Sequence, residues 1–317
     1  MHSASDLSIT TVIAAYNAER HICQALRSAM RQSVRENKII VCDDASSDRT
    51  VEVVAAIENG PIKIIFNNKN LGPGPSRDRA IEHAESQWVA LLDADDTWHC
   101  ERLRRLLAAA VSTGADVVFD DTLLCHEVRG RLVPWKRLHG TRAFGGKGTA
   151  ARIVRIEDYI TSARLLAHPL ISTDFIRRHE IEHSSRRFAE DAEFYLRLAL
   201  AGAKFCYVPE PLYHYRITPG SLTAQARDPT LMRKCLEECA QWVGWWPSAQ
   251  AAFQKKAASL RINESLYHLG EAVRRGHFST ASGLLLSHPQ LFAQLPRRLI
   301  HQVHYHAHRL IHGGSRR

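Results

Sequence analysis

The sequence lacks the cysteine spacing of a disulfide-stapled or zinc-binding protein. Its seven cysteines are scattered, and no two of them form a CxxC pair. This pattern argues against a disulfide framework and against a cysteine-bound metal, and it favours buried free thiols in a reducing cytoplasm. The seven are Cys23, Cys42, Cys100, Cys125, Cys206, Cys235 and Cys239.

Long apolar runs are also absent. No run approaches the roughly 18 to 20 residues that a helix needs to cross a bilayer. The first residues, MHSASDLSIT, have no basic stretch followed by an apolar one, so no signal peptide is expected. These absences predict a protein that is not integral to a membrane, although it could lie on a membrane surface.

Positive charge is what the sequence has in excess. Its 317 residues carry 42 Lys and Arg against 33 Asp and Glu, a formal net charge of +9. This balance favours an anionic partner such as a nucleotide, a nucleic acid or a membrane surface. A basic surface that serves only solubility is the alternative. The length suits one large domain with an appendage, or two domains.

Apolar runs alternate with helical patterns through the first 120 residues. This alternation predicts an α/β fold whose mixed, mainly parallel sheet has helices on both faces. In such sheets, ligands bind beyond the carboxyl ends of the strands. The expected strands are residues 8–15, 38–42, 62–66, 88–92 and 115–119, and the expected helices are residues 19–31, 48–57, 75–84 and 101–111.

The regular alternation ends after residue 120. The Gly- and Arg-rich stretch 121–150 is expected to be an exposed excursion or a mobile loop. Two helices and a strand follow, and from about residue 226 the pattern is strongly helical with three tryptophans close together. These features are helices 171–178 and 188–200, strand 203–210, and Trp242, Trp245 and Trp246.

Polar and acidic residues follow the expected strands at the point where each strand ends. Any one of them could be a simple turn, because Asp and Asn are common turn residues. Their recurrence after consecutive strands favours a binding site along one edge of the sheet. The residues are Tyr16, Asn17, Asp43, Asp44, Asn67, Asn68, Asn70, Asp93, Asp95, Asp96, Asp120 and Asp121.

Three carboxylates, Asp93, Asp95 and Asp96, crowd the end of one apolar strand. Like charges this close raise one another's pKa, so a positive group is expected beside them. Oxygen ligands suit Mg²⁺ and Mn²⁺. An ion held by Asp93 and Asp95 could bridge a diphosphate and offset the charge on a departing phosphate.

The same letters fit a different class of enzyme. The stretch from Asp93 to Thr97 matches the Asp-x-Asp-x-Thr signature of haloacid-dehalogenase-type phosphatases, in which Asp93 would be the nucleophile. That family carries the motif on a strand near its N-terminus, whereas here it follows the fourth expected strand. The phosphatase is therefore kept as an alternative.

An ordered set of motifs resembles the inverting family-2 glycosyltransferases, which have the Rossmann-like GT-A fold. The motifs are TVIAAYNAERHICQALRSAMRQS, IIVCDDASSDRT, NLGPGPSRDRAIEHA and WVALLDADDTW, followed by FAEDAEFYLRLALAGAKFCYVPEPLYHYRITPGSLT. The resemblance covers residues 8–223. Within the family, NLGPGPSRDRAI and YRITPGSLT look most like bacterial enzymes that build exopolysaccharide units, such as succinoglycan glucosyltransferases.

The resemblance implies a UDP-sugar donor at the edge of the sheet. Tyr16 would lie along the uracil, Asp44 would accept a hydrogen bond from the base, and Arg77 would stand near the base or the diphosphate. Many relatives have Arg-Asn where this chain has Arg77-Asp78. The implied nucleotide-sugar-binding residues are Ala14, Tyr16, Asn17, Asp43, Asp44, Arg77, Asp93, Ala94 and Asp95.

A divalent cation, Mn²⁺ or Mg²⁺, is implied as well. Its expected ligands are Asp95 with Asp93 or Asp96, and His214 in the LYHYR stretch as a further candidate. Arg216 of the same stretch would touch phosphate. Gly72 and Gly74 flank a proline and are expected to allow a tight turn beside the nucleotide.

The pair Glu190-Asp191 begins an expected helix. An acidic first turn is favoured by the helix dipole, so the pair could be purely structural. The resemblance implies instead that Asp191 is the general base that deprotonates the acceptor hydroxyl, and that Glu190 orients the acceptor. Such base catalysis typically contributes about 10²- to 10⁴-fold in rate.

The sequence predicts two domains, a GT-A domain at 1–223 and a helical region at 224–317. Apolar residues recur at helical spacing through 299–311 among Arg and His side chains. This pattern fits a helix at a membrane surface, and packing on the first domain or on a second subunit fits it equally well.

These inferences predict a cytoplasmic, metal-dependent inverting glycosyltransferase, at the inner face of the cell membrane if it is membrane-bound. It would move a sugar, UDP-glucose or a similar hexose being the donor, to a hydroxyl of a growing, lipid-linked glycan. No nucleic-acid partner is expected. A nucleotide-sugar-binding scaffold without transfer activity is the remaining alternative.

Overall fold

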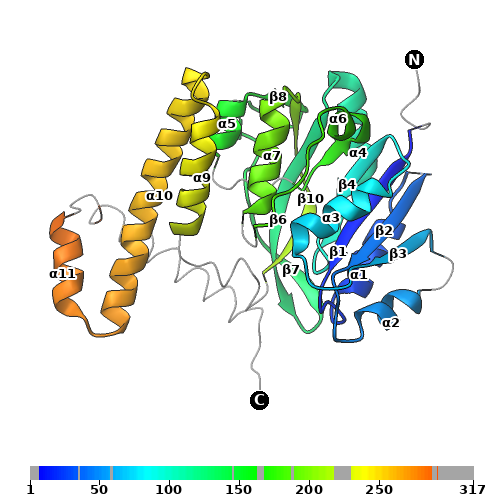
Figure 1. The fold of residues 1–317 in the computed structure, drawn as a ribbon, viewed down its shortest axis with the longest axis horizontal. Coiled ribbons are helices and arrows are strands. Elements are labelled where there is room, and N and C mark those ends of the chain that lie inside the picture. The colour runs from blue at the N-terminus through cyan, green and yellow to red at the C-terminus, as the bar shows by residue number, and fades with distance from the viewer. Residues whose placement is uncertain are drawn as a thin grey trace. The chain divides into compact units, whose positions relative to one another are not determined.

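The structure is a computed structural model that describes residues 7–34, 36–57, 60–144, 146–162, 168–186, 189–217, 230–287 and 291 (Figure 1). The chain divides into two compact units, and each is described by itself. The first comprises Met1–Cys125 and Lys136–Arg216, and the second comprises His126–Trp135 and Ile217–Arg317. The domain boundary predicted after residue 223 lies outside the described residues.

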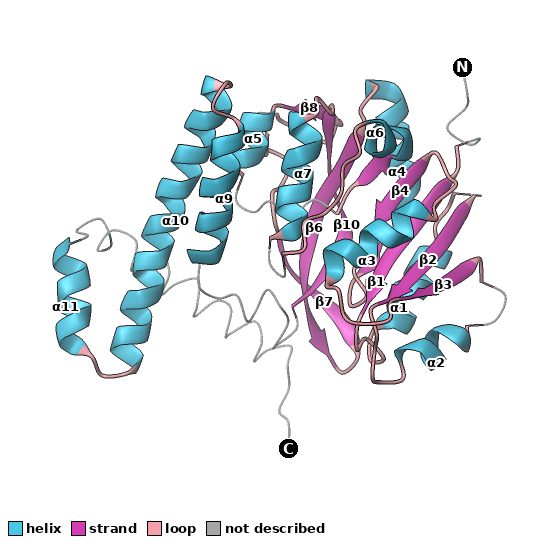
Figure 2. Cartoon of the chain, viewed as in Figure 1, coloured by secondary structure: helices cyan, strands magenta, loops and turns pink. Residues whose placement is uncertain are grey.

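One mixed sheet forms the framework of the first unit (Figure 2). Its strands are β1 (Ile9–Ala15), β2 (Asn37–Asp43), β3 (Ile62–Phe66), β4 (Trp88–Leu91), β5 (Thr97–Trp98), β6 (Val117–Val128), β7 (Arg131–Arg137), β8 (Arg152–Val154), β9 (Leu170–Ser172) and β10 (Phe205–Ile217). The order is β3-β2-β1-β4-β9-β6-β10-β5, with β7 beside β6 and β8 beside β10. Strands β1 to β4 pair in parallel, and β9 pairs antiparallel to both β4 and β6.

Helices cover both faces of this sheet (Figure 2). They are α1 (Ile22–Met30), α2 (Thr50–Ala55), α3 (Pro73–Glu82), α4 (Arg102–Thr113), α5 (Ile156–Ile160), α6 (Thr173–Arg178) and α7 (Glu190–Leu200). Ile13 of β1 belongs to one core with Leu26 of α1 and Leu106 of α4, while α3 packs on β1 and β2 from the other face. Consecutive residues of β1 are therefore buried, as expected for a strand covered on both faces.

The first four expected strands lie within one residue of the predicted bounds, but the fifth does not. Strand β6 runs to Val128, past the predicted end at residue 119, so Asp120 and Asp121 lie inside a strand. Arg129 and Gly130 then reverse the chain into β7, both with positive φ, 49° and 76°. Two such residues suit a tight hairpin. Much of 121–150 is thus a β-hairpin, and the predicted loop was wrong there.

A second difference lies at residues 171–178, which the sequence predicted to be one helix. The structure has the short strand β9 and then α6. Ser172 is the junction, because its backbone is extended and its Oγ accepts a hydrogen bond from Phe175 N at 3.3 Å, which caps α6. The predicted strand 203–210 is also longer in the structure, where β10 continues to Ile217.

Within the second unit, His126–Trp135 contribute to β6 and β7, whereas the described residues 230–287 form helices, as the sequence predicted for this region. Helix α10 (Pro247–Arg274) packs against α9 (Thr230–Trp242) and α11 (Phe278–Ser287). Arg233 of α9 joins the first pair through an ion pair of 2.7 Å with Glu264. Among the described helices, none is both long and apolar enough to span a bilayer. The predicted amphipathic segment 299–311 lies outside the described residues.

Candidate active site

The carboxyl ends of β1, β2 and β4 meet at one edge of the sheet, because these strands are parallel neighbours. The turn that follows β4, residues 93–96, is called the carboxylate turn below. Asp96 N donates a hydrogen bond to the backbone oxygen of Asp93 at 3.1 Å, which closes the turn. The edge predicted from the sequence therefore exists.

Two nitrogen-bearing side chains face Asp93. Arg77 Nη2 donates to Asp93 Oδ1 at 2.8 Å, and His168 Nε2 lies 3.1 Å from Oδ2. Burial alone would raise the pKa of Asp93, but Arg77 and His168 outweigh burial and hold that pKa well below its usual range. The positive group that the crowded carboxylates required is thus Arg77, assisted by His168.

The other two carboxyls of the turn differ from Asp93. Burial, reinforced by Asp93, raises the pKa of Asp95 to about 6. Burial also raises the pKa of Asp96 well above its usual value, and Asp95 adds to this. Asp96 Oδ1 accepts from Arg216 N at 2.6 Å, whereas its buried Oδ2 has no hydrogen-bond partner among the described residues. A buried oxygen of this kind is unusual in a native protein and fits a site for a cation or a proton.

Asp93, Asp96 and His168 together could hold a metal ion. One ligand atom from each lies within 4.8 Å of the others. Two carboxylates and an imidazole form a donor set that suits Mn²⁺ and is compatible with Mg²⁺. Asp96 Oδ2, which has no hydrogen-bond partner among the described residues, is the oxygen of Asp96 that an ion could contact.

The metal ligands predicted from the sequence are only partly grouped in this way. The cluster holds Asp93 and Asp96 but not Asp95. His214 lies opposite Thr97 in the pairing of β10 with β5, and it is outside the cluster. Its neighbours on β10, Tyr213 and Tyr215, contact the His168 ring, so alternation along the strand directs His214 to the other face.

Sequence analysis missed His168, which comes from the RLLAHPLI stretch. Its ring stacks on Tyr213, with centroids 4.1 Å apart. Its backbone oxygen accepts from Arg102 Nη2, and Arg102 also donates to the buried Asp120. His168 has a positive φ of 41°, a strained conformation for a residue with a Cβ. A lone His before a proline carries no spacing signal, so the sequence offered no means of finding it.

Helix α7 brings the predicted general base to the same site. Glu190 is buried and its Oε1 accepts from Arg77 Nη1 at 3.1 Å, so Arg77 bridges α7 and the carboxylate turn. Asp191 Oδ1 accepts from Ala192 N at 2.7 Å. Burial, reinforced by Glu190, raises the pKa of Asp191 to about 6, while Arg77 and His168 oppose this rise. A carboxyl with a pKa near 6 is suited to accept a proton at neutral pH.

The predicted roles of the two arginines differ from their observed contacts. Both terminal nitrogens of Arg77 contact carboxylates of the protein, and the position near the base or the diphosphate stays a prediction. Arg216 is 1% exposed, and its Nε donates to the backbone oxygen of Asp95 at 2.6 Å. Arg216 thus supports the carboxylate turn from inside the protein.

The predicted uridine-binding residues line two loops. Tyr16 is 51% exposed beyond β1, which leaves its ring available for stacking. Asn17 joins the two loops, since Asn17 N donates to Ser46 Oγ and Asn17 Oδ1 accepts from Ser47 N. Ala14 and Ala94 are half-buried beside these loops. All four predicted residues therefore lie at the same edge.

The two carboxylates after β2 are buried. Asp44 Oδ1 accepts from Asn67 Nδ2 and Leu71 N, and Oδ2 accepts from Gly72 N at 2.9 Å. Asp44 therefore holds the loop before α3, and the base contact predicted for it stays a prediction. Asp43 Oδ2 accepts from Ser46 N, while its Oδ1 is buried without a partner among the described residues.

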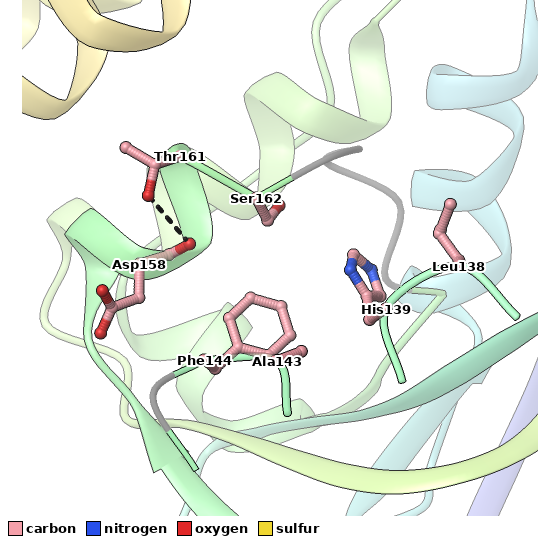
Figure 3. A pocket seen from close by; sticks show the side chains of 7 residues that line it. All are labelled: Leu138, His139, Ala143, Phe144, Asp158, Thr161 and Ser162. Atoms are coloured by element: carbon pink, nitrogen blue, oxygen red, sulfur yellow. Dashed lines mark hydrogen bonds between the residues drawn. The ribbon is translucent and has the colours of Figure 1, made fainter. Parts of the chain in front are cut away.

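A cavity of about 290 Å³ is lined by residues 138–144, which follow β7, and by residues 158–162 at the end of α5 (Figure 3). Its wall combines aromatic and apolar side chains with hydroxyl and carboxyl groups. Figure 3 shows Phe144 and His139 facing Ser162 across it. The lining residues are Leu138, His139, Ala143, Phe144, Asp158, Thr161 and Ser162.

Comparison with known proteins agrees with this fold. Residues 10–167 match the model of the family described as Glycosyl transferase family 2, and this part of the chain belongs to that family. The chain is 30% identical to the succinoglycan biosynthesis protein ExoO of Rhizobium meliloti (strain 1021), over 69% of this chain and 63% of the relative.

A second relative, from Escherichia coli, is a UDP-Glc:alpha-D-GlcNAc-diphosphoundecaprenol beta-1,3-glucosyltransferase, WfaP. It is 36% identical over 28% of this chain and 36% of its own length. The chain thus spans less than two thirds of both relatives. The crystal structure of S. aureus TarS 1-349 in complex with UDP-GlcNAc has the same fold, with a TM-score of 0.64 at 22% identity over 80% of this chain and 71% of that one.

The family assignment argues against the phosphatase alternative. In that reading Asp93 would be a nucleophile on a strand near the N-terminus of its domain, whereas here it follows β4. Both of its oxygens contact Arg77 or His168, which hold the carboxylate in place. The resemblance to family-2 glycosyltransferases inferred from the sequence motifs is confirmed.

Proposed function

We propose that the chain transfers a sugar from a UDP-sugar to a hydroxyl of a growing polysaccharide unit, with inversion at the anomeric carbon. The observation that carries this proposal is the Arg77 bridge, which ties Glu190 to Asp93 at 3.1 and 2.8 Å. It joins the helix with the candidate base to the turn with the candidate donor site. A transferase needs both groups beside one anomeric carbon.

Asp191 is the general base of the proposed reaction. Its Oδ2 accepts no hydrogen bond from the described residues and is available to a substrate hydroxyl. The acceptor oxygen attacks the anomeric carbon as its proton passes to Asp191, and the bond from that carbon to the diphosphate oxygen breaks. Attack from the side opposite the leaving diphosphate inverts the configuration.

Asp93, Asp96 and His168 are the proposed ligands of Mn²⁺ or Mg²⁺. When bound, the ion would offset the negative charge of the leaving diphosphate. The protein prepares for this by keeping Asp93 ionised, through Arg77 and His168, and by leaving Asp96 Oδ2 unpartnered. Asp95 stays in the donor site as a candidate for the ribose or the ion.

The relatives support a hexose donor and a lipid-linked acceptor without fixing either one. WfaP is named for UDP-glucose and a diphosphoundecaprenol acceptor, and TarS was crystallised with UDP-GlcNAc. We therefore propose a UDP-hexose, UDP-glucose first, as donor. The cavity of Figure 3 is the proposed approach for the acceptor glycan, since its mixed aromatic and polar wall suits a sugar ring.

A lipid-linked acceptor would require work at a membrane surface, and we place the protein in the cytoplasm at that surface. Support comes from the turn between α9 and α10, where Trp245 is 71% exposed and stacks on Trp246 with centroids 5.6 Å apart. Exposed tryptophans favour the boundary between lipid and water. The formal net charge of +9 is compatible with anionic lipids.

A thermal-shift screen of UDP-sugars, with and without Mn²⁺, tests the proposed function. A ligand at 100 times its Kd stabilises a protein by about 2.7 kcal/mol, which raises Tm measurably. We expect one UDP-hexose to raise Tm when Mn²⁺ is present and not when it is absent. In Asp96→Asn, which lacks a proposed metal ligand, this metal-dependent rise in Tm should be lost. Absence of any shift with nucleotide and metal together would contradict the proposal, and the scaffold alternative would predict a shift without transfer.

A further inference from the structure

We infer that Asp78 and His183 form a positioning pair that fixes α7, the helix with the proposed base, against α3. The inference rests on the proposed function for its kinetic consequence. Asp78 is a residue of α3 (Pro73–Glu82). It follows Arg77 on α3, so neighbouring residues of one helix turn would hold the active site together.

The contact between Asp78 and His183 is made twice. His183 N donates to Asp78 Oδ2 at 2.8 Å, and His183 Nδ1 lies 2.6 Å from Asp78 Oδ1. Because an ionised carboxylate only accepts hydrogen bonds, Nδ1 carries the proton. The His183 side chain is fully buried and that of Asp78 is 16% exposed. A paired contact of this geometry fixes both the backbone and the ring of His183.

The His183 ring also contacts α7. It stacks on Phe194 with centroids 3.8 Å apart and an interplanar angle of 5°. Phe194 is three residues after Asp191 and four after Glu190, so all three share one side of α7. The ring of His183 therefore lies between Asp78 of α3 and the helix face that presents the base.

The ring is neutral in this position. Burial lowers the pKa of His183, and the contact with Asp78 only partly opposes this. His183 Nε2 is buried without a partner among the described residues, which fits a nitrogen that carries no proton. A neutral ring can stack flat on Phe194 without the cost of burying a charge. The pair is thus a hydrogen-bonded support and not a surface salt bridge.

The segment between the pair and the base needs such a support. Ala189, directly before α7, has a φ of 62°, a left-handed conformation that costs energy for alanine. The preceding segment is also tied to α7, because Ser184 Oγ donates to Glu193 Oε2 at 2.8 Å. A Cβ on Gly74 would lie 2.9 Å from His183 Cβ, so α3 and this segment pack closely. Without Asp78, the strain at Ala189 would be free to relax and move Asp191.

The test compares Asp78→Ala, Asp78→Asn and His183→Ala in the full chain with Asp174→Ala, an exposed carboxylate paired with Arg178 on α6. A misplacement of about 1 Å can reduce a rate by about 10²-fold. We expect Asp78→Ala and His183→Ala to lower kcat by about that factor, with the Kd of UDP within twofold of wild type. Asp78→Asn should recover most of the rate, because one oxygen still accepts from His183. Asp174→Ala should match wild type.

A double variant and an amide-exchange measurement separate positioning from general damage. In an Asp191→Asn background, Asp78→Ala should lower kcat no further, since it acts through Asp191. Amides of 183–194 should exchange at least tenfold faster in Asp78→Ala, and those of β1 should not. The exchange test holds even if wild type transfers no sugar, an outcome that would refute only the proposed function. Unchanged amide exchange in Asp78→Ala, or equal losses of UDP affinity and kcat, would contradict the proposed positioning role of Asp78 and His183.

Discussion

At the scale of single residues, the site separates its carboxyls by environment. Arg77 and His168 keep Asp93 ionised, whereas burial raises the pKa values of Asp95 and Asp191 to about 6. Groups of one chemical type thus receive different tasks. In the proposed reaction, Asp93 serves as a fixed anion and Asp191 as a proton acceptor that can release its proton after turnover.

Replacement of the proposed base is the most direct test at this scale. Asp191→Asn removes the proton acceptor and keeps the shape of the side chain, so kcat should fall by about 10²- to 10⁴-fold. The Kd of UDP-sugar, measured by titration calorimetry, should stay within a factor of about two, because donor contacts lie elsewhere. Asp174→Asn, on the exposed face of α6, serves as control. Full activity in Asp191→Asn would remove this residue from the mechanism.

The pH dependence of the rate follows from the same carboxyl. The base works only when it is deprotonated, so kcat should fall as pH decreases through about 6, the pKa of Asp191. Because Asp191 interacts with Glu190, the apparent pKa of the pH–rate profile belongs to the two groups together and not to Asp191 alone. Turnover at saturating donor and acceptor between pH 4.5 and 8 measures it. A rate that is constant across that interval would contradict a base with a raised pKa.

At the scale of elements, α3 is the piece on which the active site is assembled. It carries Arg77 and Asp78, and its first turn comes so close to His183 and Ser184 that only glycine fits at position 74. Gly72, with a φ of 93°, sets the direction in which α3 leaves its loop. Gly72 therefore has the turn conformation predicted for it, whereas Gly74 lies inside α3 and allows helix packing that the sequence did not indicate.

A pair of glycine substitutions checks this packing. In Gly74→Ala the added Cβ would meet His183 Cβ and Ser184 O at 2.9 Å, which should reduce the free energy of unfolding by about 1–3 kcal/mol. Gly270→Ala in α10 has nothing within 4 Å of its Cβ and should raise it by up to about 1 kcal/mol. Urea denaturation of both variants gives the two signs, and equal stability of the two would contradict the packing.

The elements also show how far the sequence could lead. Strands β1 to β4 were predictable because long β-branched runs alternate with helices, and the carboxylate turn was predictable because it ends one of them. Strand β9 has three residues, too few for a periodic signal, and it is fixed by pairing with β4 and β6. His168 lies two residues before β9, so its position depends on contacts distant in sequence.

At the scale of the whole molecule, most cysteines are buried, whereas two tryptophans of the second unit are exposed. All seven cysteines are free, and five are buried, as the sequence predicted. In the second unit Trp242 is 37% and Trp245 71% exposed at the turn between α9 and α10. The proposed contact with lipid rests on these exposed tryptophans.

Vesicle binding tests the proposed contact with lipid. The double substitution Trp245→Ala and Trp246→Ala should weaken binding to vesicles that contain anionic lipid by about tenfold or more, because two interfacial aromatic rings are lost. Co-sedimentation measures this, with Phe278→Ala, another exposed aromatic in the same unit, as the matched control. Equal sedimentation of all three proteins would place the membrane contact elsewhere or remove it.

The buried carboxylate of Asp44 has a consequence for the thermodynamics of donor binding. It already anchors the backbone of Leu71 and Gly72 in the protein alone, so little ordering of this loop is expected when a nucleotide binds. Donor binding at this edge should therefore leave the conformation of this loop unchanged. Its heat-capacity change should match the apolar surface covered by the nucleotide, with no added contribution from a folding loop.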